Sequence, residues 1–129
     1  MARILVVDDD DGLLFLIGEY LGAFGFDFTT ASSVAQARHR LKHGRYDLVI
    51  SDLHMGGESG LDLFRYVSAR YPSIRFILMT GCLDSRIKRE ALKLGVCDYM
   101  EKPFQFSDLI ETIRNSPARQ TCAELPATA

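Results

Sequence analysis

The stretch LVISD, Leu48–Asp52, is an apolar run that ends in a carboxylate, and the polar, glycine-rich segment LHMGGESG (Leu53–Gly60) follows it. Near the N-terminus a second apolar run, Arg3–Val7, ends in the acidic cluster Asp8–Asp11. Carboxylates at the ends of two strands suggest a metal site. An isolated Asp after a strand is more often a helix cap or a turn residue, so this interpretation depends on what the rest of the chain brings to the same edge.

The size and composition of the chain are those of one soluble globular domain. It has 129 residues, of which 47% are hydrophobic and 25% charged, and a domain of this size buries about two-thirds of its unfolded surface. No apolar stretch approaches the roughly 18 residues that a membrane span needs, and the N-terminus lacks the features of a secretory signal. We therefore expect no membrane contact and a cytoplasmic location.

Cysteine content and charge argue against two further classes of site. The cysteines Cys82, Cys97 and Cys122 are odd in number and lack C-x-x-C spacing, so they indicate reduced thiols, not a disulfide framework or a thiolate zinc site. The formal net charge is -2, and the basic residues are scattered along the chain. Direct nucleic-acid binding by this domain is not expected.

Short apolar runs alternate with segments of helical periodicity, which is the sequence form of repeated βαβ units. The first, third and fourth runs are almost continuously apolar, so we expect them to be central strands covered on both faces. The five expected strands are Arg3–Val7, Phe26–Ala31, Tyr46–Ser51, Ile74–Thr80 and Val96–Glu101.

Apolar residues at helical spacing follow each strand and predict five helices. After the first strand, a stripe that should face the sheet consists of Leu13 or Leu14, Ile17, Leu21 and Phe24. Similar stripes lie within residues 34–41, 61–71, 87–94 and 109–113. The chain thus predicts an α/β fold, a doubly wound parallel sheet of five strands with five helices.

Every strand-to-helix loop of such a sheet lies at the carboxyl edge of the strands, where ligands bind. That edge should bring together Asp8–Asp11, Asp52, Thr80 and Lys102, although Asp10 is more simply interpreted as a carboxylate at a helix N-terminus. Carboxylates hold Mg²⁺, while Lys and Thr stabilise phosphoryl oxygens. Oxygen ligands without a Cys/His cluster favour Mg²⁺ over zinc. The combination suits phosphoryl chemistry.

These residues resemble the receiver domain of two-component response regulators, which has a flavodoxin-like fold with strand order 2-1-3-4-5. The resemblance covers about residues 3 to 114, and its elements occur in the right order at the right strand ends. They are ILVVDDDD (Ile4–Asp11), DLVISDLHM (Asp47–Met55), FILMTG (Phe76–Gly81) and DYMEKPF (Asp98–Phe104).

The resemblance implies that Asp52 attacks the phosphoryl group of a phosphohistidine on a sensor histidine kinase or phosphotransfer protein and becomes an aspartyl phosphate. Asp9 and Asp52 would bind Mg²⁺ directly, with the backbone carbonyl of His54 as a further ligand. Asp8 would act through a metal-bound water, and Lys102 would pair with a phosphoryl oxygen.

Thr80 and Tyr99 form the switch that the resemblance implies. Thr80 would move to hydrogen-bond the phosphoryl group and vacate space that Tyr99 fills, which would change the surface of the fourth helix, fifth strand and fifth helix. Through that surface the domain would control an output domain or effector protein, or form a homodimer. Without such a switch, Tyr99 is an ordinary half-buried strand residue.

The loop after Asp52 departs from the family pattern. Where the family usually has Asp-x-x-Met-Pro, this chain has Gly56 in place of the proline, so the loop should be more mobile. His54 and Cys82 lie two residues beyond the acceptor and the switch threonine, at positions that modulate phosphoryl lifetime in the family. Otherwise His54 is an exposed loop residue and Cys82 a plain small side chain.

Residues 1–114 are expected to form the receiver domain. Residues 115–129 (NSPARQTCAELPATA) contain two prolines and no helical stripe, which is typical of a linker or disordered tail. The chain is interpreted either as a complete single-domain regulator or, preferably, as the receiver portion of a longer protein whose linker begins here.

Three other classes of function share some of these sequence features. An aspartate-nucleophile phosphatase typically shows Asp-x-Asp, whereas Asp52-Leu53-His54 lacks the second acid. A nucleotide-binding module needs a G-x-G-x-x-G or P-loop motif after the first strand, and neither is present. The surviving alternative is a receiver fold used as a phosphorylation-independent interaction module. As a receiver, the domain is not a general enzyme and would catalyse only its own phosphorylation and dephosphorylation.

Overall fold

A computed structural model describes residues 2–81, 85–96 and 98–115 of the chain. Within them, β-strands form a parallel sheet in the order β2-β1-β3-β4-β5, which confirms the predicted fold class. The strands are β1 (Arg3–Val7), β2 (Asp27–Ala31), β3 (Leu48–Asp52), β4 (Arg75–Thr80) and β5 (Asp98–Glu101).

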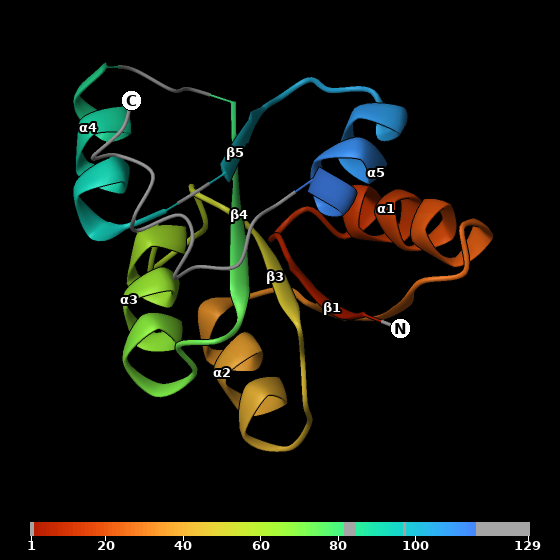
Figure 1. Cartoon of the computed structure of the whole chain (residues 1–129), viewed down its shortest axis with the longest axis horizontal. Helices are drawn as coiled ribbons and strands as arrows, with labels where there is room; N and C mark the ends of the chain where they lie inside the picture. Colours follow the sequence, from red (N-terminus) through yellow and green to blue (C-terminus); the bar gives the residue numbers. More distant parts are fainter. Residues whose placement is uncertain (1, 82–84, 97, 116–129) are drawn as a thin grey trace.

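Helices alternate with the strands and cover both faces of the sheet. Figure 1 shows α1 and α5 on one side and α2, α3 and α4 on the other. Their bounds are α1 (Asp11–Ala23), α2 (Val34–Lys42), α3 (Gly60–Arg70), α4 (Ser85–Leu94) and α5 (Phe106–Asn115). Each of these described helices is too short or too polar to cross a membrane.

The alternation of side chains along β1 shows why the inner strands are apolar throughout. Ile4 and Val6 belong to the core under α1 and α5, while Leu5 and Val7 belong to the core under α2, α3 and α4. Successive residues of a strand point to opposite faces, and both faces of this sheet are covered. The prediction that the first, third and fourth strands are central is therefore confirmed.

The register of the sheet aligns the strand ends at one edge. Val7 of β1 lies opposite Ser51 of β3, and Thr80 of β4 lies opposite Glu101 of β5. The acidic cluster, Asp52 and Lys102 each lie at or directly after these aligned positions. Parallel pairing thus delivers residues from distant parts of the sequence to the same edge.

The structure differs from the sequence-based prediction in detail. Strand boundaries differ by at most two residues, but the prediction that Phe24 faces the sheet is wrong. Helix α1 ends at Ala23, and Gly25, with φ 80°, takes the left-handed conformation that commonly ends helices. Phe24 is 46% exposed, and its ring packs on Tyr20, with 4.9 Å between ring centroids.

The turn between Asp52 and α3 is closely packed against the end of β3. Ser59 caps α3 and shares a capping box with Asp62, so the helix begins directly after the loop. The first helical residue, Gly60, donates its backbone N–H to the carbonyl of Leu53 at 2.9 Å. A Cβ on Gly60 would overlap the carbonyl oxygen of Asp52, so the close approach requires glycine.

We expect Gly60→Ala to lower the free energy of unfolding by about 1–3 kcal/mol, the usual cost of overpacking, although alanine favours a helix over glycine. Gly56→Ala is the matched control, because a Cβ there meets nothing within 4 Å. Urea unfolding measures both variants. A stability of Gly60→Ala equal to that of the wild type would contradict the close packing of this turn.

Candidate functional site

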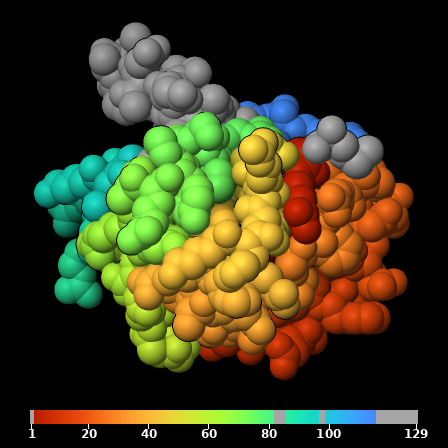
Figure 2. Space-filling model, turned by 90° about the horizontal axis from the view of Figure 1, so that it is seen from below, coloured from red at the N-terminus to blue at the C-terminus, as the bar shows by residue number. Residues whose placement is uncertain are grey.

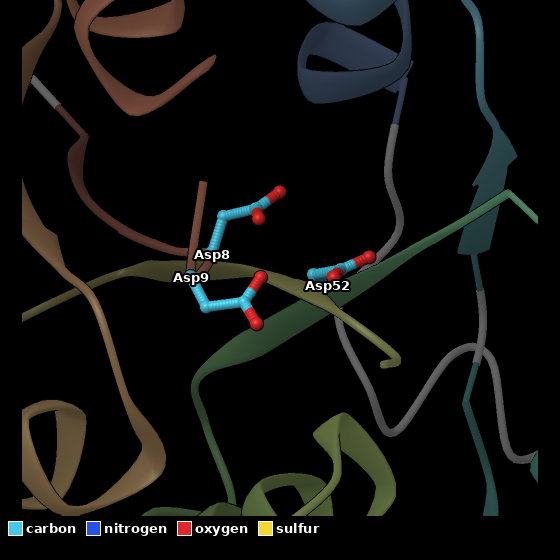
Figure 3. Close-up of side chains that lie close together, drawn as sticks. All are labelled: Asp8, Asp9 and Asp52. Atoms are coloured by element: carbon cyan, nitrogen blue, oxygen red, sulfur yellow. The ribbon is translucent and has the colours of Figure 1, made fainter. Parts of the chain in front are cut away.

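Three carboxylates meet at the carboxyl edge of the sheet. Asp8 follows β1 and is 1% exposed, and Asp52 ends β3 and is 5% exposed, whereas Asp9 lies at the surface. One carboxylate oxygen from each of the three lies within 4.8 Å of the others. Figure 3 shows the three side chains grouped at the ends of these two strands. Oxygen atoms in this arrangement are the donor set that Mg²⁺ prefers.

Lys102 joins two of these carboxylates. Its Nζ donates to Oδ2 of Asp8 at 2.8 Å and lies 3.2 Å from Oδ1 of Asp52. Its backbone N–H donates to the carbonyl of Thr80 at 2.7 Å, which fixes the start of the side chain beside the end of β4. The peptide bond from Lys102 to Pro103 is cis. The ammonium group of Lys102 thus lies between the buried carboxylates of Asp8 and Asp52.

The environment shifts the pKa values of Asp52 and Lys102. Burial raises the pKa of Asp52 and the charge of Asp8 raises it further, while Lys102 opposes both. Burial by itself would lower the pKa of Lys102, but the hydrogen bond and the charge of Asp8, followed by Asp52, outweigh it and raise that pKa. Lys102 thus stays protonated, and ionised Asp52 is destabilised in the folded protein.

Two further acids of the cluster have different surroundings. Asp10 is the N-cap of α1, and its Oδ1 accepts from the backbone N–H of Leu13 at 3.1 Å. Asp11 is in the first turn of the same helix, where a negative charge interacts favourably with the helix dipole. The interpretation of Asp10 as a helix-terminal carboxylate is confirmed. The backbone N–H of Asp10 also donates to Oδ1 of Asp8 at 3.0 Å.

Thr80 and Tyr99 lie on the adjacent strands β4 and β5. Thr80 ends β4 and is fully buried, and Tyr99 of β5 lies opposite Leu78 and is half-buried. Lys88 of α4 has its Nζ 5.4 Å from the centroid of the Tyr99 ring, and a hydrogen bond with Tyr99 raises the pKa of Lys88. The sequence reasoning missed Lys88, because an exposed lysine on a helix carries no sign of its neighbour.

The remaining predicted residues lie on the loops around the edge. His54 and Gly56 are exposed, and the N–H of Gly56 donates to Oδ2 of Asp9 at 3.3 Å. The loop after Asp52 therefore contacts the acidic cluster through its backbone. Cys82, the predicted modulator after the switch threonine, lies outside the described residues.

The fold and this site define a class of signalling protein. Residues 4–114 match the family model described as the response regulator receiver domain. The chain therefore belongs to the receiver domains of two-component response regulators.

Relatives and solved structures agree with this family. The chain is 34% identical over 126 residues to the transcriptional regulatory protein ZraR of Salmonella typhimurium, covering 96% of the chain and 29% of ZraR. It is 33% identical over 129 residues to the response regulator protein FleR of Pseudomonas aeruginosa, covering 98% of the chain and 26% of FleR. The chain thus spans less than a third of either relative.

Among solved structures, the chain is similar to the response regulator protein TrrA of Thermotoga maritima, crystallised in complex with Mg(2+)-BeF. The TM-score is 0.79 at 32% identity, and the match covers 88% of this chain and 97% of TrrA. The likeness extends over nearly the whole receiver fold.

The raised pKa of Asp52 predicts a pH dependence of stability. At a pH below 3.8, the ordinary pKa of an Asp carboxyl group, Asp52 is protonated in both the folded and the unfolded protein. As the pH rises from there through the folded pKa, the unfolded state ionises more readily, and the folded state loses stability. Without metal at neutral pH, Asp52→Asn should therefore be more stable than the wild type by more than about 0.5 kcal/mol, the range of ordinary surface substitutions.

Urea unfolding between pH 3 and pH 8 tests this, with about 1 mM EDTA present. The difference between Asp52→Asn and the wild type should shrink toward the acid end. Glu111→Gln on the exposed face of α5 removes a charge away from the site and should show no such trend. A wild type more stable than Asp52→Asn at neutral pH would contradict the argument.

Proposed function

We propose that this receiver domain accepts a phosphoryl group on Asp52 from the phosphohistidine of a sensor histidine kinase or phosphotransfer protein. The observation that carries the proposal is the position of Asp52, beside the carboxylates of Asp8 and Asp9 and in contact with the ammonium of Lys102. These are the charges that phosphoryl transfer to a carboxylate needs, namely a place for a hard cation and a fixed positive group.

In the proposed reaction, a carboxylate oxygen of Asp52 attacks phosphorus, a P–O bond forms, and the P–N bond to the imidazole breaks. The imidazole nitrogen keeps the electron pair of that bond and is reprotonated from solvent. Lys102, whose Nζ lies 3.2 Å from Asp52, would pair with a phosphoryl oxygen, and the hydroxyl of Thr80 would donate to another.

Asp8, Asp9 and Asp52 fit a bound Mg²⁺, because their oxygens lie close together and Asp8 and Asp52 are nearly buried. Mg²⁺ would supply positive charge that reduces repulsion between the attacking carboxylate and the anionic phosphoryl group. The backbone carbonyl of His54 is the further ligand that we propose.

A docking surface for the donor lies beside the site. A hollow there is lined by Leu13 of α1 and by Lys102, Pro103, Phe104 and Phe106. Leu16 of α1 is 51% exposed. Exposed apolar surface of this kind is typical of protein contact. A kinase domain bound there would bring its phosphohistidine next to Asp52.

We further propose that phosphorylation changes the surface of α4, β5 and α5 through Thr80 and Tyr99, and so controls an output domain or effector. The backbone of Lys102 is hydrogen-bonded to Thr80, and Tyr99 contacts Lys88 of α4. Residues beside the acceptor are thus continuous with that surface. The domain is a signalling switch that acts catalytically only on its own acceptor.

Incubation with acetyl phosphate and Mg²⁺ should add one phosphoryl group to the wild type, seen as a mass increase by intact-protein mass spectrometry. Asp52→Asn should stay unmodified, because an amide is not the nucleophile that a carboxylate is. Lys102→Met is expected to be modified about 100-fold more slowly, the effect of one lost electrostatic contact to the reacting group.

Beryllium fluoride provides an independent measurement. With Mg²⁺ it should shift NMR signals of α4 and β5 in the wild type and leave those of Asp52→Asn unchanged. A wild type that is neither modified by acetyl phosphate nor changed by beryllium fluoride would favour the phosphorylation-independent interaction module.

A further inference from the structure

The loop Leu53–Ser59 connects the proposed acceptor to α3. Leu53 and Met55 anchor its first half in the core, whereas Gly56 and Gly57 are exposed, and a Cβ added at either glycine would meet nothing within 4 Å. Yet the N–H of Gly56 reaches Oδ2 of Asp9 at 3.3 Å. Two adjacent glycines allow many backbone conformations, so a contact on the far side of them from Met55 would help to keep this part of the loop beside the acidic cluster.

That contact comes from Arg38 of α2. Its Nη1 donates to Oε1 of Glu58 at 3.0 Å and its Nη2 to Oε2 at 2.6 Å, and Glu58 directly follows the two glycines. The same guanidinium lies over the ring of Tyr66 on α3, 5.1 Å from its centroid. A bidentate pair between planar groups fixes direction as well as distance. Figure 2, which shows the molecule from below, shows the surfaces of α2 and α3 side by side.

We propose that Arg38 is a positioning residue for the metal site. Through Glu58 it holds the glycine half of the loop so that the backbone of Gly56 stays beside Asp9. This proposal rests on the proposed function, because the held loop would strengthen the binding of Mg²⁺. A loop that is already ordered loses less conformational entropy when a cation binds its backbone.

Charge alone predicts a different result, which makes the proposal sharp. Removing a positive charge near a cation site should tighten Mg²⁺ binding, and removing a negative charge should weaken it. Arg38→Met and Glu58→Gln would then have opposite effects. If the pair acts by holding the loop, both variants weaken Mg²⁺ binding and both loosen the loop.

The expected effect is modest, because the side chains of Arg38 and Glu58 are 34% and 45% exposed. Exposed ion pairs of this kind correspond to a factor of about two to five. In the metal-free protein, amide hydrogen exchange of residues 56–59 should be faster by about that factor in both variants. Calorimetric titration with Mg²⁺ should show affinity lowered by a similar factor in both.

Arg70→Met is the matched control. The guanidinium of Arg70 also lies over the ring of Tyr66, 5.2 Å from its centroid. Arg70→Met therefore removes one positive charge beside this ring, as Arg38→Met does, while the pair of Arg38 and Glu58 stays intact. Loop exchange should be unchanged in this control. The reversed pair, Arg38→Glu with Glu58→Arg, should restore slow exchange.

Loop exchange in Arg38→Met equal to that of the wild type would overturn the proposal, as would tighter Mg²⁺ binding by Arg38→Met. A wild type that binds no Mg²⁺ contradicts the proposed function instead. The exchange rates of the metal-free variants still decide in that case whether Arg38 holds the loop.

Discussion

The concentration of negative charge at the carboxyl edge of the sheet is the constraint on which the site depends. Asp8 and Asp52 are almost fully buried, and their oxygens and one of Asp9 lie within 4.8 Å of each other. Like charges this close repel more strongly where water is partly excluded. Lys102 contacts two of them, so one positive charge offsets three negative ones. The folded chain therefore gains from any further cation at this point.

The sheet tolerates this unfavourable cluster because the inner strands bury apolar side chains on both faces. Burial of such side chains is the main term that stabilises a fold, and β1, β3 and β4 supply it through residues that alternate between the two cores. The same strands end at the acids. Stability and the strained charge distribution thus come from the same segments, the first from their interiors and the second from their ends.

This division explains how much could be predicted from the sequence. The central place of β1, β3 and β4 and the meeting of Asp8, Asp52 and Lys102 followed from apolar periodicity and from parallel strands ending at one edge. The full strand order came from the resemblance to receiver domains. The contact of Arg38 with Glu58 could not be predicted, because the residues are 20 positions apart on polar faces, where no pattern marks a partner. The prediction that Phe24 faces the sheet was wrong for a related reason, because periodicity does not show that the helix stops at Ala23.

The connection between β4 and β5 shows how charge at the acceptor could act at a distance. In the proposed reaction, a phosphoryl group on Asp52 adds negative charge that competes with Asp8 for Lys102. The backbone N–H of Lys102 is hydrogen-bonded to the carbonyl of Thr80. Tyr99, three residues before Lys102, has its ring in contact with Lys88 of α4. In the proposed switch, a change in the partners of Lys102 would act on a strand whose other contacts include α4. The path from the charge at the acceptor to the surface of α4 in this proposed switch is therefore one short strand long.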